Sequence, residues 1–384
     1  MEKLLAIIKN SFVVFLFFLN SFHLNAQDKE AEFTIKGYVK YLPSYLDYEL
    51  YPDSKTNHLV HNRLNLRGYF KEYFSVGLEF RNRIIFGENL TISKDKGLID
   101  LSHFFVKNNN FKIHSMIDRM WLKYQKNKIE ITIGRQRVNW GVNTIWNSND
   151  LFNAYNFIDF DYIERPGSDV IRFIYNGDDL SSLEFVYKPS KDNGSIIAAL
   201  YKINKGGYDF QILGANYYDE DIVLGGGWAG NLKNAGFKGE VSYFITKKPI
   251  PNDHSLSLST SLDYSFKNGL YLLGSFLYNS NGFSDPKIFS VGSLTENVLS
   301  PKNLMPSKNS YIIQTSKPIT PAINSSLTFL YGQGIKFLYI SPNISYDINS
   351  SFDINFIGQL FYANTSGNFK SLMNGLYIQL RYNF

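Results

Sequence analysis

Apolar and polar residues alternate along many short segments of this chain, which is typical of half-buried β-strands. Residues 58–70 place Leu64 and Leu66 on one face and Arg63 and Arg67 on the other. The same period of two runs through a series of segments separated by Gly-, Asn- and Lys-rich turns. The pattern therefore predicts an all-β fold.

Counting the alternating segments gives about 18 strands, with 16 to 18 as the range. The expected strands are 33–45, 58–70, 73–87, 116–125, 128–136, 168–177, 181–189, 194–203, 207–218, 221–231, 236–246, 255–266, 269–280, 309–319, 323–332, 335–347, 351–363 and 371–384. Patterning is weakest between 190 and 250.

Two features favour a membrane-spanning barrel over a soluble sandwich, which would also have one apolar face. Many of the segments are longer than the five or six residues of an ordinary strand and suit tilted spans. The connections also alternate in length, as those of outer-membrane barrels do. Longer ones are expected at 46–57, 88–115, 137–167, 247–254 and 280–309. The prediction is a transmembrane antiparallel up-and-down β-barrel with an inward-folded loop.

The N-terminus has the layout of a secretory signal peptide: Lys3 and Lys9, an apolar run, and Ala26 as a cleavage residue. We expect residues 1–26 to be cleaved and residues 27–384 to form one barrel domain. No run of 18 apolar residues follows, which excludes a helical membrane protein.

The composition agrees with a lipid-facing wall. Aromatic residues make up 16% of the chain and charged residues 19%, and there is no cysteine. The formal net charge of +5 is too small to indicate nucleic-acid binding. We therefore expect no nucleic-acid partner, and the absence of cysteine excludes a disulfide framework.

The C-terminal segment resembles the terminal signal of outer-membrane barrels. It ends in Phe384, with Leu380 and Tyr382 at alternate positions before it. In that family the terminal strand is read by the barrel-assembly machinery. The resemblance implies a Gram-negative outer-membrane location and that machinery as a partner.

A second motif resembles one found in porin-like outer-membrane barrels that include relatives of alginate-export channels. Its residues are Gly134, Arg135, Gln136, Trp140, Gly141, Asn149, Asp150, Arg165, Pro166 and Gly167. The motif covers about a tenth of the chain and carries no information on the substrate. Val142 stands where that group often has an acidic residue, so no role tied to such a carboxylate is carried over to this chain.

The loop 137–167 is unusually aromatic for a solvated connection. Burying each large aromatic side chain contributes about 1.5–3 kcal/mol, so the loop should pack either into the lumen or against a partner protein. We favour the lumen, where it would act as a constriction, with a short helix over 148–157. The residues expected to form the constriction are Arg135, Arg137, Trp140, Trp146, Asp159, Asp161 and Arg165. The alternative is that the loop only braces the barrel and contacts no solute.

The early strands carry a basic face that we assign to the lumen, because charge on the lipid face is costly. The residues of this expected pore wall are Arg63, Arg67, Arg81, Arg83, Arg119 and Arg172. Rings of arginine favour anions in pores. The alternative is that these charges pair across strands and hold the shape of the wall. Later strands place mostly Ser, Asn and Gln inward, which would suit neutral polar solutes such as sugars.

The function predicted from the sequence is passive diffusion of small polar or anionic solutes through an outer-membrane porin-like channel. The runner-up is a non-transport barrel that serves as accessory or scaffold of an envelope complex. No enzyme, cofactor or metal site is predicted; His58 and His61, for example, would point to opposite faces of a strand. We expect outer-membrane lipid to surround the barrel. The sequence does not decide whether the chain forms a homo-oligomer.

Overall fold

The computed structural model describes residues 31–48, 54–88, 90, 92, 95, 97–153, 166–191, 194–247, 254–285, 300–365 and 368–384. The expected signal peptide, residues 1–26, lies outside them. No helix of these residues is long and apolar enough to span a membrane.

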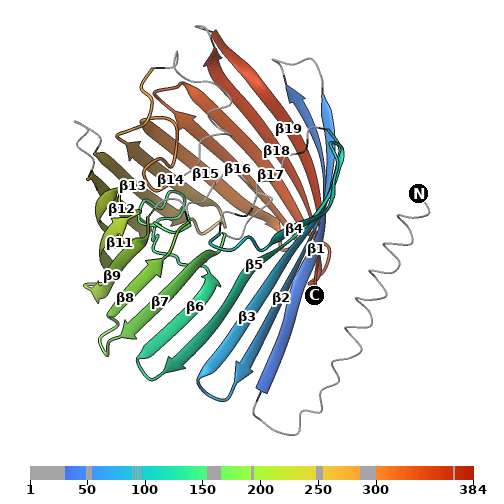
Figure 1. Ribbon diagram of the computed structural model, residues 1–384. Coiled ribbons are helices and arrows are strands. Elements are labelled where there is room, and N and C mark those ends of the chain that lie inside the picture. The colour runs from blue at the N-terminus through green and yellow to red at the C-terminus, as the bar shows by residue number, and fades with distance from the viewer. Residues whose placement is uncertain are drawn as a thin grey trace.

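The described strands form one closed antiparallel barrel (Figure 1). Each wall strand pairs with the next, and β1 pairs with both β2 and β19. Of the 19 strands, β4 adds to β5 without separating it from β3, so the wall has 19 − 1 = 18 strands. The strands are β1 (Ala31–Tyr48), β2 (Lys55–Phe70), β3 (Phe74–Phe86), β4 (Ser102–Lys107), β5 (Phe111–Lys126), β6 (Ile129–Gln136), β7 (Ser168–Asn176), β8 (Ser182–Lys188), β9 (Ile196–Lys205), β10 (Tyr208–Tyr217), β11 (Asp221–Leu232), β12 (Ala235–Thr246), β13 (Ser255–Ser265), β14 (Tyr271–Asn279), β15 (Asn309–Thr320), β16 (Ile323–Gly332), β17 (Phe337–Asp347), β18 (Phe352–Thr365) and β19 (Asn368–Asn383).

The eighteen strands expected from alternation correspond one to one with the eighteen wall strands. The predicted barrel and its strand number are therefore confirmed. The sequence did not predict β4, which lies inside the expected long connection 88–115. This strand pairs with the part of β5 near His114, beyond the part of β5 that pairs with the shorter β6.

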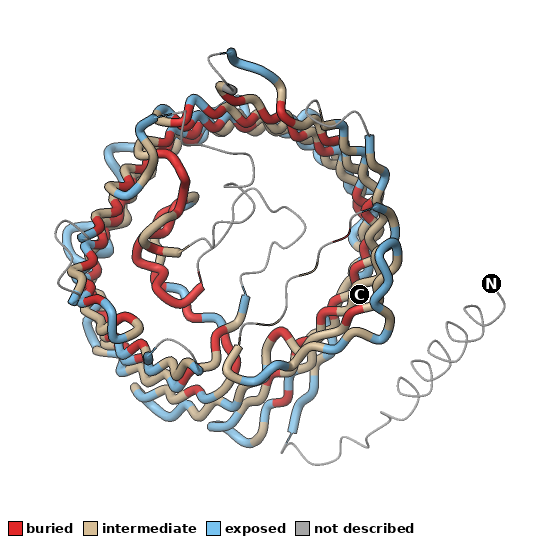
Figure 2. Tube along the Cα trace, turned by 45° about the horizontal axis from the view of Figure 1, so that its top comes forward, coloured by how far each residue is buried: buried red, intermediate tan, exposed pale blue. Residues whose placement is uncertain are grey.

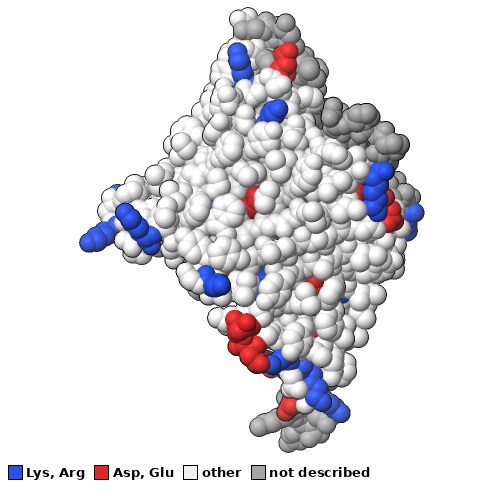
Figure 3. Space-filling model, turned by 90° about the vertical axis from the view of Figure 1, so that its left-hand side faces the viewer, with Lys and Arg blue, Asp and Glu red and all other residues white. Residues whose placement is uncertain are grey.

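The outer surface of the barrel is apolar because every second residue of each strand points away from the lumen. Ile171, Ile197 and Ile212, for example, have 48%, 55% and 69% of their surface exposed. Figure 3 shows that one side of the molecule is largely free of charged side chains, which gather toward its margins. Such a wall suits lipid, in which a closed barrel leaves no backbone group unpaired.

The barrel closes where its last residue meets the first strand. The backbone of Phe384 exchanges two hydrogen bonds with Gly37, at 2.9 and 3.0 Å. A Cβ atom at Gly37 would lie 2.4 Å from the carbonyl oxygen of Arg63 and 2.8 Å from the ring of Phe384. The absence of a side chain at Gly37 therefore allows the C-terminal ring to cover this seam.

Candidate functional site in the barrel lumen

The segment 138–153 of the aromatic loop lies inside the ring of strands (Figure 2). Trp140 and Phe152 meet edge to face, with ring centroids 5.1 Å apart, and are 0% and 5% exposed. They pack against the inward side chains of β7 to β12. That cluster contains Val138, Leu151, Val170, Val186, Ile196, Ala198, Leu200, Leu213, Tyr217, Val223 and Phe244. The large aromatic side chains of this segment are thus buried in the lumen.

Trp140 is also fixed by polar contacts. Its indole Nε1 donates to Glu184 Oε1 at 2.7 Å, and its carbonyl oxygen accepts from Gln211 Nε2 at 2.7 Å. Glu184 is held in turn by a bidentate pair with Arg172, at 2.7 and 2.9 Å. The charged wall and the aromatic loop are therefore parts of one network.

Glu240, on the inward face of β12, anchors the main chain of the loop. Its Oε1 accepts the backbone N–H groups of Val142 and Asn143, both at 2.6 Å. Its Oε2 accepts the N–H of Asn149 at 2.9 Å. The carboxylate is completely buried. Three hydrogen bonds to one side chain fix both ends of the turn 142–149 against the wall.

Serine side chains of β12 and β13 continue this anchorage. Ser242 donates to the carbonyl oxygen of Ser148 at 2.9 Å, and Ser259 donates to that of Trp146 at 2.8 Å. Ser261 donates to Asn143 Oδ1 at 2.6 Å. The sequence suggested that such serines would meet neutral solutes, but these three are buried beneath the loop. They satisfy its backbone instead.

The expected short helix over 148–157 is not present in its described part, 148–153, which forms turns. The reason is that Asn149, which could have capped such a helix, forms its hydrogen bonds with the barrel wall instead. Asn149 donates its backbone N–H to Glu240, and its Oδ1 accepts from Ser242 at 2.7 Å. The remaining residues of the expected helix lie outside the described chain.

A second inward segment, which the sequence did not predict, contacts the first. Leu304 and Met305 of the connection after β14 are buried at 6% and 4% exposure, in one cluster with Trp146. The rest of that cluster comes from the inward faces of β14 to β19 and the turn after β16, namely Leu277, Ile312, Leu330, Ile335, Phe337, Tyr339, Phe361, Ala363 and Leu372. The sequence did contain a signal for this second segment: apolar residues occupy inward positions of these strands, which a water-filled lumen alone would not favour.

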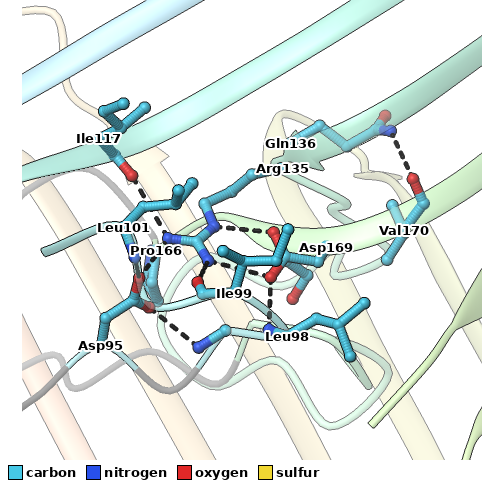
Figure 4. Close-up of polar contacts among 12 residues, drawn as sticks. Asp95, Leu98, Ile99, Leu101, Ile117, Arg135, Gln136, Pro166, Asp169 and Val170 are labelled. Atoms are coloured by element: carbon cyan, nitrogen blue, oxygen red, sulfur yellow. Dashed lines mark hydrogen bonds and ion pairs between the residues drawn. The ribbon is translucent and has the colours of Figure 1, made fainter.

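Arg135 does not belong to the lumen, contrary to the sequence prediction that placed it in the constriction. Alternation from Ile133, which is 50% exposed, puts it on the outer face of β6, and Asp169 shares that face on β7. Figure 4 shows its guanidinium between Asp169 and Asp95. Its Nη2 atom also donates to the carbonyl oxygen of Ile99 at 2.7 Å. Arg135 is 3% exposed, so it braces the wall where β5, β6 and β7 diverge.

The expected basic wall separates into covered and accessible members. Arg63 is 1% exposed and pairs with Glu79 at 2.5 Å and Asp118 at 2.9 Å. Arg81 is 8% exposed, and Arg83 lies 3.2 Å from His114 Nδ1. The alternative that charges pair across strands therefore describes Arg63 well.

In six lumen ion pairs of the described residues that reach solvent, the cation is the more exposed partner. The exposed fractions of cation and carboxylate side chains are 46% and 3% for Arg67–Glu79, 14% and 3% for Arg119–Glu79, 29% and 14% for Lys123–Glu130, 21% and 6% for Arg172–Glu184, 25% and 1% for Lys302–Asp221, and 31% and 8% for Arg381–Asp353. The longer cationic side chains extend over their shorter partners. The lumen therefore displays positive groups although the charges are largely compensated.

Arg137 is exposed at the start of the loop. Asp159, Asp161 and Arg165 lie outside the described residues. The residues of the expected assembly signal, Leu380, Tyr382 and Phe384, are 40% to 42% exposed. Within the described ranges, no three His, Asp or Glu side chains gather as metal ligands would.

Solved structures with the same fold cover nearly the whole chain. OprD of Pseudomonas aeruginosa has a TM-score of 0.59 at 8% identity, over 94% of this chain and 97% of that one. OccK7 (OpdD) of Pseudomonas aeruginosa has a TM-score of 0.59 at 11% identity, over 92% and 99%. OccAB4 of Acinetobacter baumannii has a TM-score of 0.57 at 12% identity, over 94% and 100%. At these identities the likeness concerns the fold. No protein-family model matches the chain, and no curated protein matches it by sequence.

Proposed function

We propose that this protein is an outer-membrane porin-like channel for passive diffusion of small polar or anionic solutes. The solved structures that share its fold are outer-membrane porins, which supports both the location and the activity. An 18-strand wall encloses a lumen too wide for its own side chains to fill, and such barrels conduct water-soluble molecules.

The proposal depends chiefly on the side chains that the lumen displays. Six ion pairs all expose the cation more than the carboxylate, with Arg67 the most exposed at 46%. An anion near this wall meets guanidinium and ammonium groups before it meets the carboxylates behind them. Accessible rings of such groups favour anions in pores.

The loop 137–167 is proposed as the constriction of this channel. Residues 138–153 of this loop are fixed against the inward faces of β7 to β13, which supports a role in narrowing the channel. This placement disfavours the scaffold alternative in the form that we considered, because Trp140 and Trp146 are buried inside the barrel and unavailable to a partner protein.

Two finer assignments complete the proposal. The terminal residues Leu380, Tyr382 and Phe384 would be recognised by the barrel-assembly machinery, since they are outward-facing and form the closing seam. The resemblance of 134–167 to alginate-export-type barrels would then reflect the brace at Arg135 and the docked turn at Trp140. Neither feature identifies a solute.

The test is the electrical behaviour of the purified protein in planar lipid bilayers. We expect stepwise conductance increments, and in a salt gradient a reversal potential of the sign that anion preference gives. Absence of conductance from folded protein would overturn the channel assignment. A cation-selective reversal potential would leave the channel in place and overturn the proposed role of the exposed cations.

A further inference from the structure

A row of polar side chains crosses the outer face of the barrel. Asn62 on β2 lies opposite Asn82 on β3, which lies opposite Ser115 on β5. Ser115 Oγ donates to Asn82 Oδ1 at 2.6 Å, and Asn82 Nδ2 donates to Asn62 Oδ1 at 3.0 Å. Asn62 Nδ2 donates to the carbonyl oxygen of Tyr38 at 3.1 Å. His103 continues the row on β4.

These residues face lipid because their chain neighbours face the lumen. Asn82 stands between Arg81 and Arg83, whose side chains lie on the inner face. The nearest residues on the same outer face of β3 are Phe80 and Ile84. The corresponding positions on β5 are Ile113 and Ile117. The row is therefore polar in apolar surroundings.

The row lies inside the apolar band rather than at its border. The aromatic border of the band on this side contains His58, which stacks on Phe86 with ring centroids 4.5 Å apart. His58 and Phe86 are each four positions from the row along their strands. Four residues at about 3.3 Å each on a strand tilted by about 40° correspond to a depth of about 10 Å. Lipid headgroups lie too far away to reach the row.

The hydrogen-bonding capacity of the row exceeds what the row itself uses. Each asparagine Nδ2 has two N–H groups, and among the described residues each donates one hydrogen bond. Hydrocarbon offers no acceptor for the second N–H. Polar side chains in such positions promote association between membrane-embedded proteins.

We propose that this face is where a second copy of the chain docks, with Asn62, Asn82 and Ser115 at the centre of the contact. Amide and hydroxyl groups both donate and accept, so the row is complementary to its own copy across a two-fold axis. The nearby charged side chains on this face, Arg135, Asp95 and Asp169, bind one another and are only 3%, 6% and 16% exposed, so they offer the partner little charged surface.

Apolar side chains beside the row supply packing for such a contact. Phe105 on β4 is 66% exposed and Ile99 is 59% exposed, so both extend from the wall. His103 packs edge to face against Phe105, with centroids 4.9 Å apart. A polar centre flanked by projecting apolar groups is the arrangement expected of an interface within a membrane.

Cysteine cross-linking tests the proposal cleanly because the natural chain has no cysteine. Phe105→Cys places a thiol on the proposed interface. Ile212→Cys on β10, at a residue with 69% exposure, is the matched control on another part of the wall. After oxidation of intact membranes, we expect the Phe105→Cys chain to form covalent dimers several-fold more abundantly than the control.

Removing the polar side chains of the row should abolish the difference in cross-linking between the Phe105→Cys chain and the Ile212→Cys control. Asn62→Leu with Asn82→Leu, and separately Ser115→Ala, are introduced into the Phe105→Cys chain, with heat-modifiable gel migration as the check of folding. We expect cross-linking to fall to the control level in folded variants. Equal cross-linking of both cysteines, persistence of the dimer without the row, or cross-links only to another protein would overturn the proposal. Conductance is not measured, so this result is independent of the channel assignment.

Discussion

The Oε1 atom of Glu240 on β12 accepts the backbone N–H of Asn143 at 2.6 Å, although the two residues are 97 positions apart. The same carboxylate binds the N–H groups of Val142 and Asn149. One wall side chain therefore determines where the main chain of the inward loop lies.

Glu240→Gln should loosen the constriction. The amide replaces one acceptor oxygen with a donor that faces backbone N–H groups, and each buried donor left unsatisfied costs about 1–3 kcal/mol. We expect larger and noisier single-channel currents from a barrel that still folds. Ser257→Ala is the control, since the buried Ser257 hydroxyl has no hydrogen-bond partner among the described residues. Currents identical to wild type would contradict the anchoring role of Glu240.

Trp140→Ala combined with Trp146→Ala should widen the pore. Each tryptophan is buried in a different apolar cluster, and truncating a buried tryptophan removes about 3–5 kcal/mol of packing. We expect the loop to leave the wall and the mean conductance to rise clearly in planar bilayers. Trp228→Ala is the matched control, because Trp228 packs over Gly239 on the outer face. If conductance is unchanged in the double variant, the segment 138–153 does not limit flow.

Neutralising the exposed lumen cations should reduce anion preference. Arg67→Gln, Lys123→Gln and Arg381→Gln each remove the more exposed member of an ion pair, so the carboxylate behind it contributes more to the local potential. The reversal potential in a salt gradient should shift toward cation selectivity, most strongly in the triple variant. Lys128→Gln, in the short turn between β5 and β6, should leave the reversal potential unchanged. Selectivity that is independent of these three residues would show that other groups select the solute.

Arg135→Ala should destabilise the barrel without changing selectivity. It leaves Asp95 and Asp169 without their shared guanidinium, and breaking a buried ion pair costs about 3–5 kcal/mol. We expect a lower temperature for the loss of the folded band in heat-modifiability gels. Arg135→Lys should recover only part of this loss, because lysine cannot reproduce the bidentate contact with Asp169. A shift in reversal potential with unchanged stability would place Arg135 in the lumen after all.

The wall could be predicted from the sequence because alternation reports directly which face of a strand meets an apolar medium. Where alternation was weak, between 190 and 250, the structure supplies the reason. Leu200 and Val223 face inward and yet are buried, because the inward loop covers them. Strands that are buried on both faces lose their period of two.

Arg135 illustrates a signal that the sequence contained but that the prediction did not use. It follows Ile133 by two positions on one strand, which places both on the outer face. Its position inside a porin-like motif suggested the lumen instead. A buried arginine on an outer face becomes plausible only when its carboxylate partners are known, and Asp95 comes from a different connection.

By itself, the sequence determined the barrel, its eighteen wall strands and the loop rich in aromatic residues, since these follow from local periodicity and from the need to bury apolar surface. The tertiary structure alone decided which charges the lumen displays, how Glu240 holds the loop and that Leu304 and Met305 also turn inward. The contacts that hold the loop join residues about a hundred positions apart. Hydrogen bonds and ion pairs of that kind depend on side-chain positions that no local pattern specifies.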